Sequence, residues 1–250
     1  EANFPSFTKD KLTAKFIFSG AKDVTIGTDK YTFTVTANGT QLNASKNSAT
    51  ATKIATIDAD GIITYNKADE NAQALLNKSA YNVDPFTVGI EIVVTNECDE
   101  ILPLTGNKFD VKFLRPITVK ADKMDNFKDG VDVGAEGSVI DVKLAFTDWR
   151  NYAFVTTPIN YYTYYGVKSI TIDTDKAQTT VNGKYEPIPA GMKVEYSGVE
   201  DISAGKFGKL TYINNKAEVG EFDIKLPVAV EYAWGTVEFD IVCHVAKTVK

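Results

Sequence analysis

The chain is poor in the residues that carry most nucleophilic and metal chemistry. Its 250 residues include a single histidine, His244, and two cysteines, Cys98 and Cys243. One histidine rules out a Ser-His-Asp triad anywhere except around residue 244 and removes ordinary zinc sites, which need several His or Cys ligands. Two cysteines are too few for a disulfide scaffold. We therefore expect a protein that is not an enzyme and has no resident cofactor.

Long apolar runs and clusters of positive charge are missing as well. No apolar segment approaches the roughly 20 residues that a membrane-spanning helix needs. The net charge is −6, with Lys and Arg scattered singly, so nucleic acid is not an expected partner. No apolar leader follows Glu1, which we expect to be a mature or trimmed N-terminus. We expect membrane contact only through an N-terminal lipid anchor that this sequence does not contain.

The chain does contain an internal repeat. FDVKFLRPITVK at 109–120 and FDIVCHVAKTVK at 239–250 share five of twelve positions. Two shorter matches keep the same order, because GIITY at 61–65 precedes Val88-Gly89 as GKLTY at 208–212 precedes Val219-Gly220. A collinear repeat of this kind predicts two copies of one folding unit.

The end of the repeated segment predicts where the two domains meet. The second copy ends at Lys250, so the first copy should end at Lys120. We predict domains of residues 1–120 and 121–250, each long enough to bury its own core.

Alternation of apolar and polar residues is the main secondary-structure signal. The run FDIKLPVAVEY at 222–232 places its apolar residues on one face, and VEFDIVCHV at 237–245 does the same. Pro227 falls on the polar side, which predicts an edge strand or a bulge there. Asn38-Gly39 and Asn182-Gly183 fit type I′ hairpin turns. The pattern predicts an all-β chain of two tandem immunoglobulin-like antiparallel sandwiches.

The two copies differ by an insertion in the first. Tyr65 and Val88 are 23 positions apart, whereas Tyr212 and Val219 are only seven apart. The sixteen extra residues include ADENAQALLNK, whose apolar residues fall on one helical face, with Asn66 able to cap. We predict a short helix near 66–78, inserted between two strands.

A tyrosine-rich segment of the second copy, between 149 and 165, is the best candidate for a ligand site. The candidate residues are Trp149, Tyr152, Tyr161, Tyr162, Tyr164 and Tyr165. If the segment is extended, one member of each adjacent tyrosine pair faces solvent, where exposed rings with Asp and Asn nearby suit stacking against a sugar. Alternatively, the inward rings belong to the core and the outward rings cover an edge strand.

Calcium is the metal ion that the acidic turns would suit best. DNFKDGVD at 125–132 brings together Asp125, Asp129 and Asp132 near the predicted domain junction. The segment does not match the twelve-residue calcium-binding loop, and Asp and Gly also favour turns for their own reasons. A Cys243-His244 dyad is not expected, because adjacent strand residues project to opposite faces. Carboxylate pairs of the glycosidase type stay open, because 33 acidic residues offer many pairs.

The segment 208–245 resembles a known family of bacterial surface proteins. Its Gly-x-Leu-x-Tyr strand, its Pro-Val-x-Val-x-Tyr strand, the pair Trp234-Gly235 and the closing strand resemble the tandem Ig-like-domain surface lipoproteins of Gram-negative gut anaerobes that are assigned to cell adhesion. The first copy departs from the pattern, with Thr105-Gly106 in place of Trp-Gly. The resemblance implies export, lipid anchoring, and a binding or structural role without catalytic residues.

Two functions follow from these features. The first is a non-enzymatic extracytoplasmic protein, at the cell surface or in the periplasm, that serves as a scaffold for adhesion or surface assembly. The alternative is a glycan-binding module that uses the aromatic residues around 149–165. The expected partner is a protein or a glycan at the cell surface.

Overall fold

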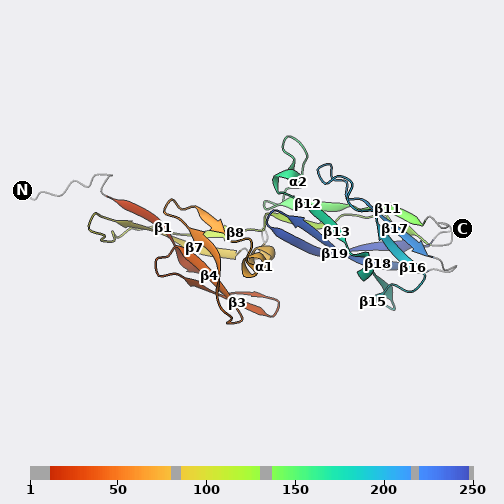
Figure 1. Cartoon of the computed structure of the whole chain (residues 1–250), viewed down its shortest axis with the longest axis horizontal. Helices are drawn as coiled ribbons and strands as arrows, with labels where there is room; N and C mark the ends of the chain where they lie inside the picture. Colours follow the sequence, from red (N-terminus) through yellow and green to blue (C-terminus); the bar gives the residue numbers. More distant parts are fainter. Residues whose placement is uncertain (1–11, 80–85, 130–136, 215–219, 248–250) are drawn as a thin grey trace, which may run out of the picture. The chain divides into compact units, whose positions relative to one another are not determined.

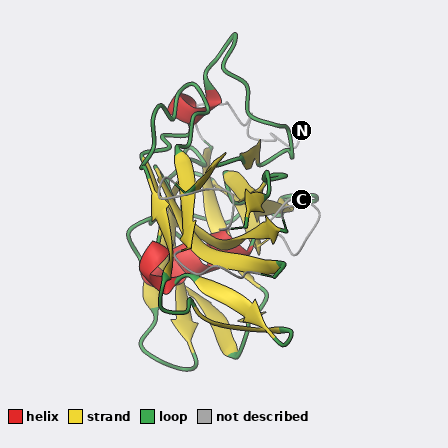
Figure 2. Ribbon diagram, turned by 90° about the vertical axis from the view of Figure 1, so that its right-hand side faces the viewer, coloured by secondary structure: helices red, strands yellow, loops and turns green. Residues whose placement is uncertain are grey.

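The chain folds into two compact units made mainly of β-strands. The structure is a computed structural model that describes residues 12–79, 86–129, 137–214 and 220–247. The division falls between Glu1–Arg115 and Pro116–Lys250. Figure 2 shows how far strands outweigh helices. No helix in the described residues is long and apolar enough to cross a membrane.

The first unit is a two-layer antiparallel sandwich (Figure 1). One layer pairs, in this order, β1 (Thr13–Ala21), β7 (Phe86–Thr95) and β8 (Lys108–Phe113). The other layer is a meander of β2 (Val24–Ile26), β3 (Asp29–Val35), β4 (Gln41–Lys46), β5 (Thr52–Ile57) and β6 (Ile63–Tyr65). Phe18 and Ile90 from the first layer and Leu42 and Ile54 from the second belong to one buried core. The two sheets therefore bury their apolar faces against each other.

The helix predicted near 66–78 is confirmed as α1 (Glu70–Lys78). It buries Leu75 and Leu76 in the core of the first unit. The helix begins later than expected, because Asp69 and not Asn66 is the cap: the Asp69 carboxylate accepts a hydrogen bond from the Ala72 amide at 3.0 Å. The Asn66 side chain instead donates to the Lys53 carbonyl at 2.8 Å.

The second unit has the strand arrangement of an immunoglobulin-like sandwich. One layer contains β9 (Ile117–Ala121), β12 (Leu144–Asp148), β11 (Ser138–Asp141), β17 (Lys209–Asn214) and β16 (Met192–Tyr196). The other contains β10 (Phe127–Lys128), β19 (Gly235–Ala246), β18 (Phe222–Tyr232), β13 (Ser169–Ile172), β14 (Gln178–Val181) and β15 (Lys184–Pro187). The chain enters in the first layer with β9 and crosses to the second with β10, which pairs in parallel with the last strand, β19.

The buried residues of the second unit come from both of its layers. Val119, Phe146 and Leu210 lie in the first layer, and Leu226 and Ile241 lie in the second. With the first unit, this confirms the predicted fold class: two tandem immunoglobulin-like antiparallel sandwiches, with a short helix inserted in the first.

The division between the units lies ahead of the predicted boundary at residue 120. The repeat aligns the closing strands, but it also carries residues 117–120 into the first copy. Those residues belong to β9, whose Val119 pairs with Phe146 on β12 of the second unit. The last strand of the first unit, β8, has already ended at Phe113.

Pro227 marks neither an edge strand nor a bulge in the pairing of its strand with β19, the two alternatives that its position in the sequence predicted. Its strand, β18, is central and pairs with β19 on one side and with β13 and β14 on the other. A short 3-10 turn (Thr174–Lys176) separates β13 from β14 beside this proline, and the Asp173 amide donates to the Pro227 carbonyl at 3.0 Å. The neighbouring strand is therefore interrupted where Pro227 lacks a backbone donor.

The two Asn-Gly turns differ from each other. Asn182 and Gly183 both have positive φ, 49° and 77°, as a type I′ turn between β14 and β15 requires. At the first hairpin only Gly39 has positive φ, 75°, and the Thr36 amide donates to the Gln41 carbonyl across a longer loop. The prediction of a type I′ turn is therefore wrong at Asn38-Gly39.

Candidate binding site: the aromatic loop of the second unit

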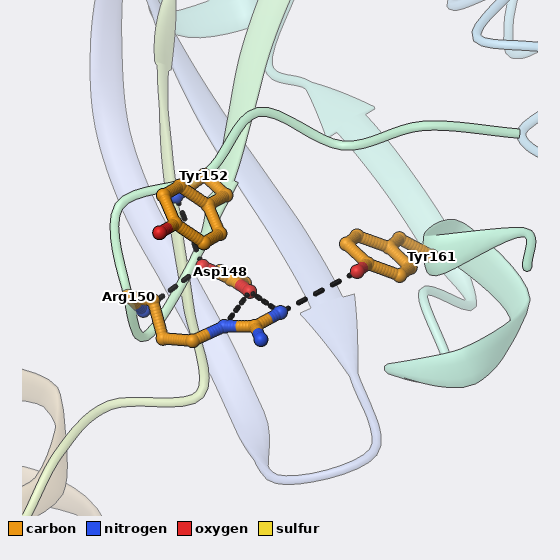
Figure 3. A network of polar contacts seen from close by, with 4 residues as sticks. All are labelled: Asp148, Arg150, Tyr152 and Tyr161. Carbon is orange, nitrogen blue, oxygen red and sulfur yellow. Dashed lines mark hydrogen bonds and ion pairs between the residues drawn. The ribbon is translucent and has the colours of Figure 1, made fainter.

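The candidate site is the aromatic loop, which we define as residues 149–165 between β12 and β13. Asp148, the last residue of β12, supports its first part with a buried side chain. One carboxylate oxygen accepts from the backbone amides of Arg150 and Tyr152, both at 2.9 Å (Figure 3). Asn151 completes the turn with a φ of 67°. This is a turn in which an aspartate side chain takes the place of a backbone acceptor.

The second oxygen of Asp148 holds the Arg150 side chain. The guanidinium Nε and Nη2 atoms donate to it at 2.8 and 2.6 Å (Figure 3). These hydrogen bonds raise the pKa of Arg150. Nη2 also reaches the Tyr161 hydroxyl at 3.4 Å. A single carboxylate therefore ties the turn, the arginine and the tyrosine-rich part of the loop together.

Arg150 lies over the rings of two aromatic neighbours. Its guanidinium carbon is 5.5 Å from the centre of the Trp149 ring and 5.1 Å from that of Tyr152. Both distances are within the range of cation–π attraction. The arginine therefore helps to fix the two rings in place and covers part of each of them.

The tyrosine-rich part forms a short helix rather than an extended segment. α2 (Tyr161–Tyr164) is capped by Asn160, whose side chain accepts from the Thr163 amide at 3.3 Å and donates to the Ser203 carbonyl at 2.8 Å. Helical geometry, not strand alternation, therefore decides which rings face inward.

Two of the six candidate rings are partly buried and pack against the core. Tyr162 packs against Phe146, Phe154 and Phe207, with ring centres 5.1 to 6.0 Å apart. Tyr165 stacks on Phe154 at 5.3 Å. Burial raises the pKa of both tyrosines. Their rings serve as the foundation of the loop rather than as its surface.

Three of the other four candidate rings form the outer surface of the loop, and we call them the outer set. Trp149 is 45% exposed, Tyr152 63% and Tyr164 69%, while Tyr161 is half-buried between Phe154 and Tyr165. Val155 and Ile159, on the same loop, are exposed as well. The fold therefore gathers all six predicted residues in one loop and divides them into an inner and an outer set.

Two residues that organise this loop are not among the sequence candidates. Asp148 and Arg150 are not aromatic, so the search for aromatic residues did not select them. The sequence also does not show that their side chains are in contact. The signal that could have found Asp148 is its position at the end of an alternating strand, three residues before Asn151, in a pattern typical of side-chain-closed turns.

The predicted calcium ligands do not form a recognisable site in the described residues. The Asp125 carboxylate pairs with the Lys143 ammonium at 2.9 Å. Asp129 is buried, and its amide donates to the Ala246 carbonyl at 3.0 Å. Asp132 lies outside the described residues. Among those described, no group of three His, Cys, Asp or Glu side chains is arranged to hold a metal. Calcium binding stays a prediction.

His244 and Cys243 face opposite sides of β19. The His244 ring nitrogen Nδ1 lies 2.9 Å from the Asp223 carboxylate on the outer face of the sheet. Cys243 is fully buried, and this burial raises the pKa of its thiol to about 12. A protonated thiol on the far side of the sheet cannot act with this histidine as a nucleophile–base pair.

Comparisons with known proteins do not identify a family for this chain. No protein-family model matches the chain. No curated protein matches it either. Among solved structures, cadherin-like domains 1 to 4 of zebrafish RET align over 96% of this chain with 13% identity and a TM-score of 0.23. This chain spans 42% of the length of that structure. At this TM-score we base no argument on the likeness.

Proposed function

We propose that the chain is a non-catalytic interaction module of an extracytoplasmic protein, acting in adhesion or surface assembly, and that its aromatic loop contacts a protein partner. The observation that carries the proposal is the outer set of Trp149, Tyr152 and Tyr164, which stays exposed while the buried Asp148 carboxylate fixes its base. Exposing large aromatic rings to solvent does not stabilise the fold. Rings that a buried side chain holds in solvent are available to bind a partner.

The kinds of residue on the loop favour a protein partner. Trp, Tyr and Arg are the residues most enriched at the energetic centres of protein interfaces. Large rings on a fixed turn also lose little conformational freedom on binding. Because Asp148 already pairs with Arg150 at 2.6 Å, the loop is an aromatic surface rather than a site for an anion.

A glycan is the second candidate partner. Tyr164 is the most exposed ring of the loop and could stack on a sugar. Arg150, however, lies over both Trp149 and Tyr152 and occupies part of the ring faces on which a sugar would stack. For this reason we place the protein partner first.

The extracytoplasmic location rests on the resemblance to surface lipoproteins and on the choice of fold. Tandem immunoglobulin-like sandwiches are common among cell-surface proteins. Membership of that lipoprotein family and attachment through a lipid are part of the proposal.

The test compares adhesion of beads coated with the chain to panels of immobilised extracellular proteins and glycans. We expect Trp149→Ala and Tyr164→Ala each to weaken binding to a protein target by about tenfold or more. Val242→Ala is the matched control, because Val242 is also 45% exposed but lies on β19, away from the loop. Binding only to glycans would support the second candidate, and equal losses in all three variants would overturn both.

A further inference from the structure

The sequence contains two Asn-Gly pairs, and both lie in turns between paired strands. In such a pair the backbone nitrogen of the glycine can attack the side-chain carbonyl carbon of the asparagine, because a glycine has no Cβ to block the approach. The attack needs an asparagine side chain that can turn toward this nitrogen, and a nitrogen that no other group holds. The surroundings of the two pairs therefore decide which of them can react in the folded chain.

The first pair, Asn38-Gly39, is held by hydrogen bonds and by packing. The Gly39 amide donates to the Thr36 carbonyl at 2.8 Å. The Asn38 side-chain oxygen accepts from the hydroxyls of Thr36 and Thr40 at 2.8 and 2.9 Å, and from the Thr40 amide at 3.3 Å. Gly39 is buried, and a Cβ placed on it would lie 2.6 Å from the Cβ of Ile17. The nitrogen and the side chain that would have to meet are therefore each held by other groups.

The second pair, Asn182-Gly183, has none of these restraints. Both residues are exposed in the turn between β14 and β15. A Cβ placed on Gly183 would meet no atom within 4 Å. Within the described residues, neither the Asn182 side chain nor the Gly183 amide makes a hydrogen bond. The turn therefore leaves both reacting groups in solvent.

We propose that Asn182 is a site of spontaneous deamidation in the folded chain, with water as the co-reactant. The Gly183 nitrogen forms a bond to the side-chain carbonyl carbon of Asn182, and the C–N bond of the side-chain amide breaks. The proton of the Gly183 amide leaves with the side-chain amino group as ammonia. Water then opens the cyclic imide at one of its two carbonyl groups, which gives aspartate or isoaspartate. Neither step oxidises or reduces the chain.

The modification should change the hairpin in two ways. Both products add a negative charge beside Lys184. Isoaspartate also lengthens the backbone of the turn by a methylene group, which a type I′ turn does not accommodate. Among the described elements β15 is the edge strand of its sheet, so the change should free β15 and leave β14 bonded to β18. The hairpin lies outside the aromatic loop, so its modification is independent of the proposed function.

The test incubates the full chain at mildly alkaline pH and follows the change from amide to acid by mass spectrometry. Trypsin separates the two pairs into the peptides 31–46 and 177–184, and a sample digested before incubation corrects for changes during digestion. In the folded chain, Asn182 should react about tenfold or more faster than Asn38, because the bonds around Asn38 must open first. In the chain unfolded by denaturant, the two rates should become similar.

Two matched variants make the test specific. Asn182→Gly removes the reacting carbonyl and should abolish the change in peptide 177–184. Glycine accepts the φ of 49° at this position, so the turn should be kept. Asn38→Gly is the control and should leave the rate at Asn182 unchanged.

Several results would overturn the proposal. One is a folded chain in which Asn38 reacts as fast as Asn182 or faster. Another is an Asn182 that reacts only after unfolding, which would mean that the type I′ turn itself protects the pair. An equally large preference for Asn182 in the unfolded chain would show that the neighbouring sequence, and not the fold, sets the rates. A change in peptide 177–184 that persists in Asn182→Gly would assign it to another residue.

Discussion

At the scale of single residues, the aromatic loop depends on one carboxylate. Asp148 is buried and accepts two hydrogen bonds from backbone amides and two from the Arg150 guanidinium. A buried charge is costly unless it is paired and hydrogen-bonded, and here both conditions are met. The exposed rings of Trp149 and Tyr152 can therefore stay in solvent without loosening the strand that carries them.

Removing this carboxylate should destabilise the second unit. Asp148→Ala leaves two amide donors and a guanidinium without their acceptor, and we expect it to lower the free energy of unfolding by about 2–4 kcal/mol. Asp148→Asn keeps one acceptor oxygen and should cost less. Denaturant unfolding measures both variants. Asp240→Ala is the control, because the Asp240 carboxylate is half-exposed and 3.8 Å from Lys225; a loss as large in the control would contradict this account of Asp148.

The two cysteines should differ sharply in reactivity. Cys98 is exposed, whereas Cys243 is buried with its pKa raised to about 12, so its thiol stays protonated near neutral pH. A chromogenic disulfide reagent should therefore titrate one thiol per native chain and two after denaturation. Cys98→Ser should abolish the native signal. Rapid reaction of both thiols in the native chain would mean that β19 opens readily.

At the scale of elements, the sequence predicted strands better than it predicted their neighbours. Alternation identified β18 and β19, because in a strand with one buried face apolar and polar residues alternate with a period of two. The prediction for Pro227 was wrong, because the strand interruption that accommodates this proline lies between β13 and β14, on another segment of the chain. The aromatic loop was found by composition, but its division into inner and outer rings follows from α2 and Asp148, which depend on tertiary contacts.

Adjacent residues of β19 test the inward and outward assignment. Ile241 is completely buried and Val242 is 45% exposed. Ile241→Ala should cost about 2–5 kcal/mol of unfolding free energy because it leaves a cavity in the core. Val242→Ala should cost less than about 0.5 kcal/mol, as exposed substitutions do. Chemical denaturation measures the unfolding free energy of both variants. Similar losses would contradict the assignment of Ile241 to the inner face and Val242 to the outer face of β19.

The cap of α1 can be tested in the same way. The Asp69 side chain accepts from the Ala72 amide at 3.0 Å and from the Thr52 hydroxyl at 3.1 Å. Asp69→Ala should therefore lower stability by about 1–2 kcal/mol, whereas Asp69→Asn, which keeps an acceptor, should cost less. Asn66→Ala serves as the comparison, because Asn66 was the cap predicted from the sequence. A larger loss at Asn66 than at Asp69 in thermal unfolding would reverse the assignment.

At the scale of the whole molecule, the chain contains two copies of one folding unit, and different elements complete their cores. In the second unit Tyr212 packs against Phe127 of β10 at 5.6 Å, and the position equivalent to Phe113 is the small Cys243. In the first unit Phe113 itself packs against Tyr65, and α1 contributes Leu75 and Leu76 to the core. The larger side chain and the helix thus supply part of the volume that β10 supplies in the other copy.

This difference should appear in the thermal unfolding of the chain. Among the described residues the two cores have no member in common. Within the described parts of the chain, the first unit buries 14 apolar residues in its core and the second 23, so calorimetry should show two transitions, the lower one from the first unit. Ile54→Ala should lower that transition, and Leu226→Ala the other, each by roughly 10 °C. Each variant is the control for the other, since both remove a completely buried aliphatic side chain. If both variants lowered a single common transition equally, the two units would unfold as one cooperative unit.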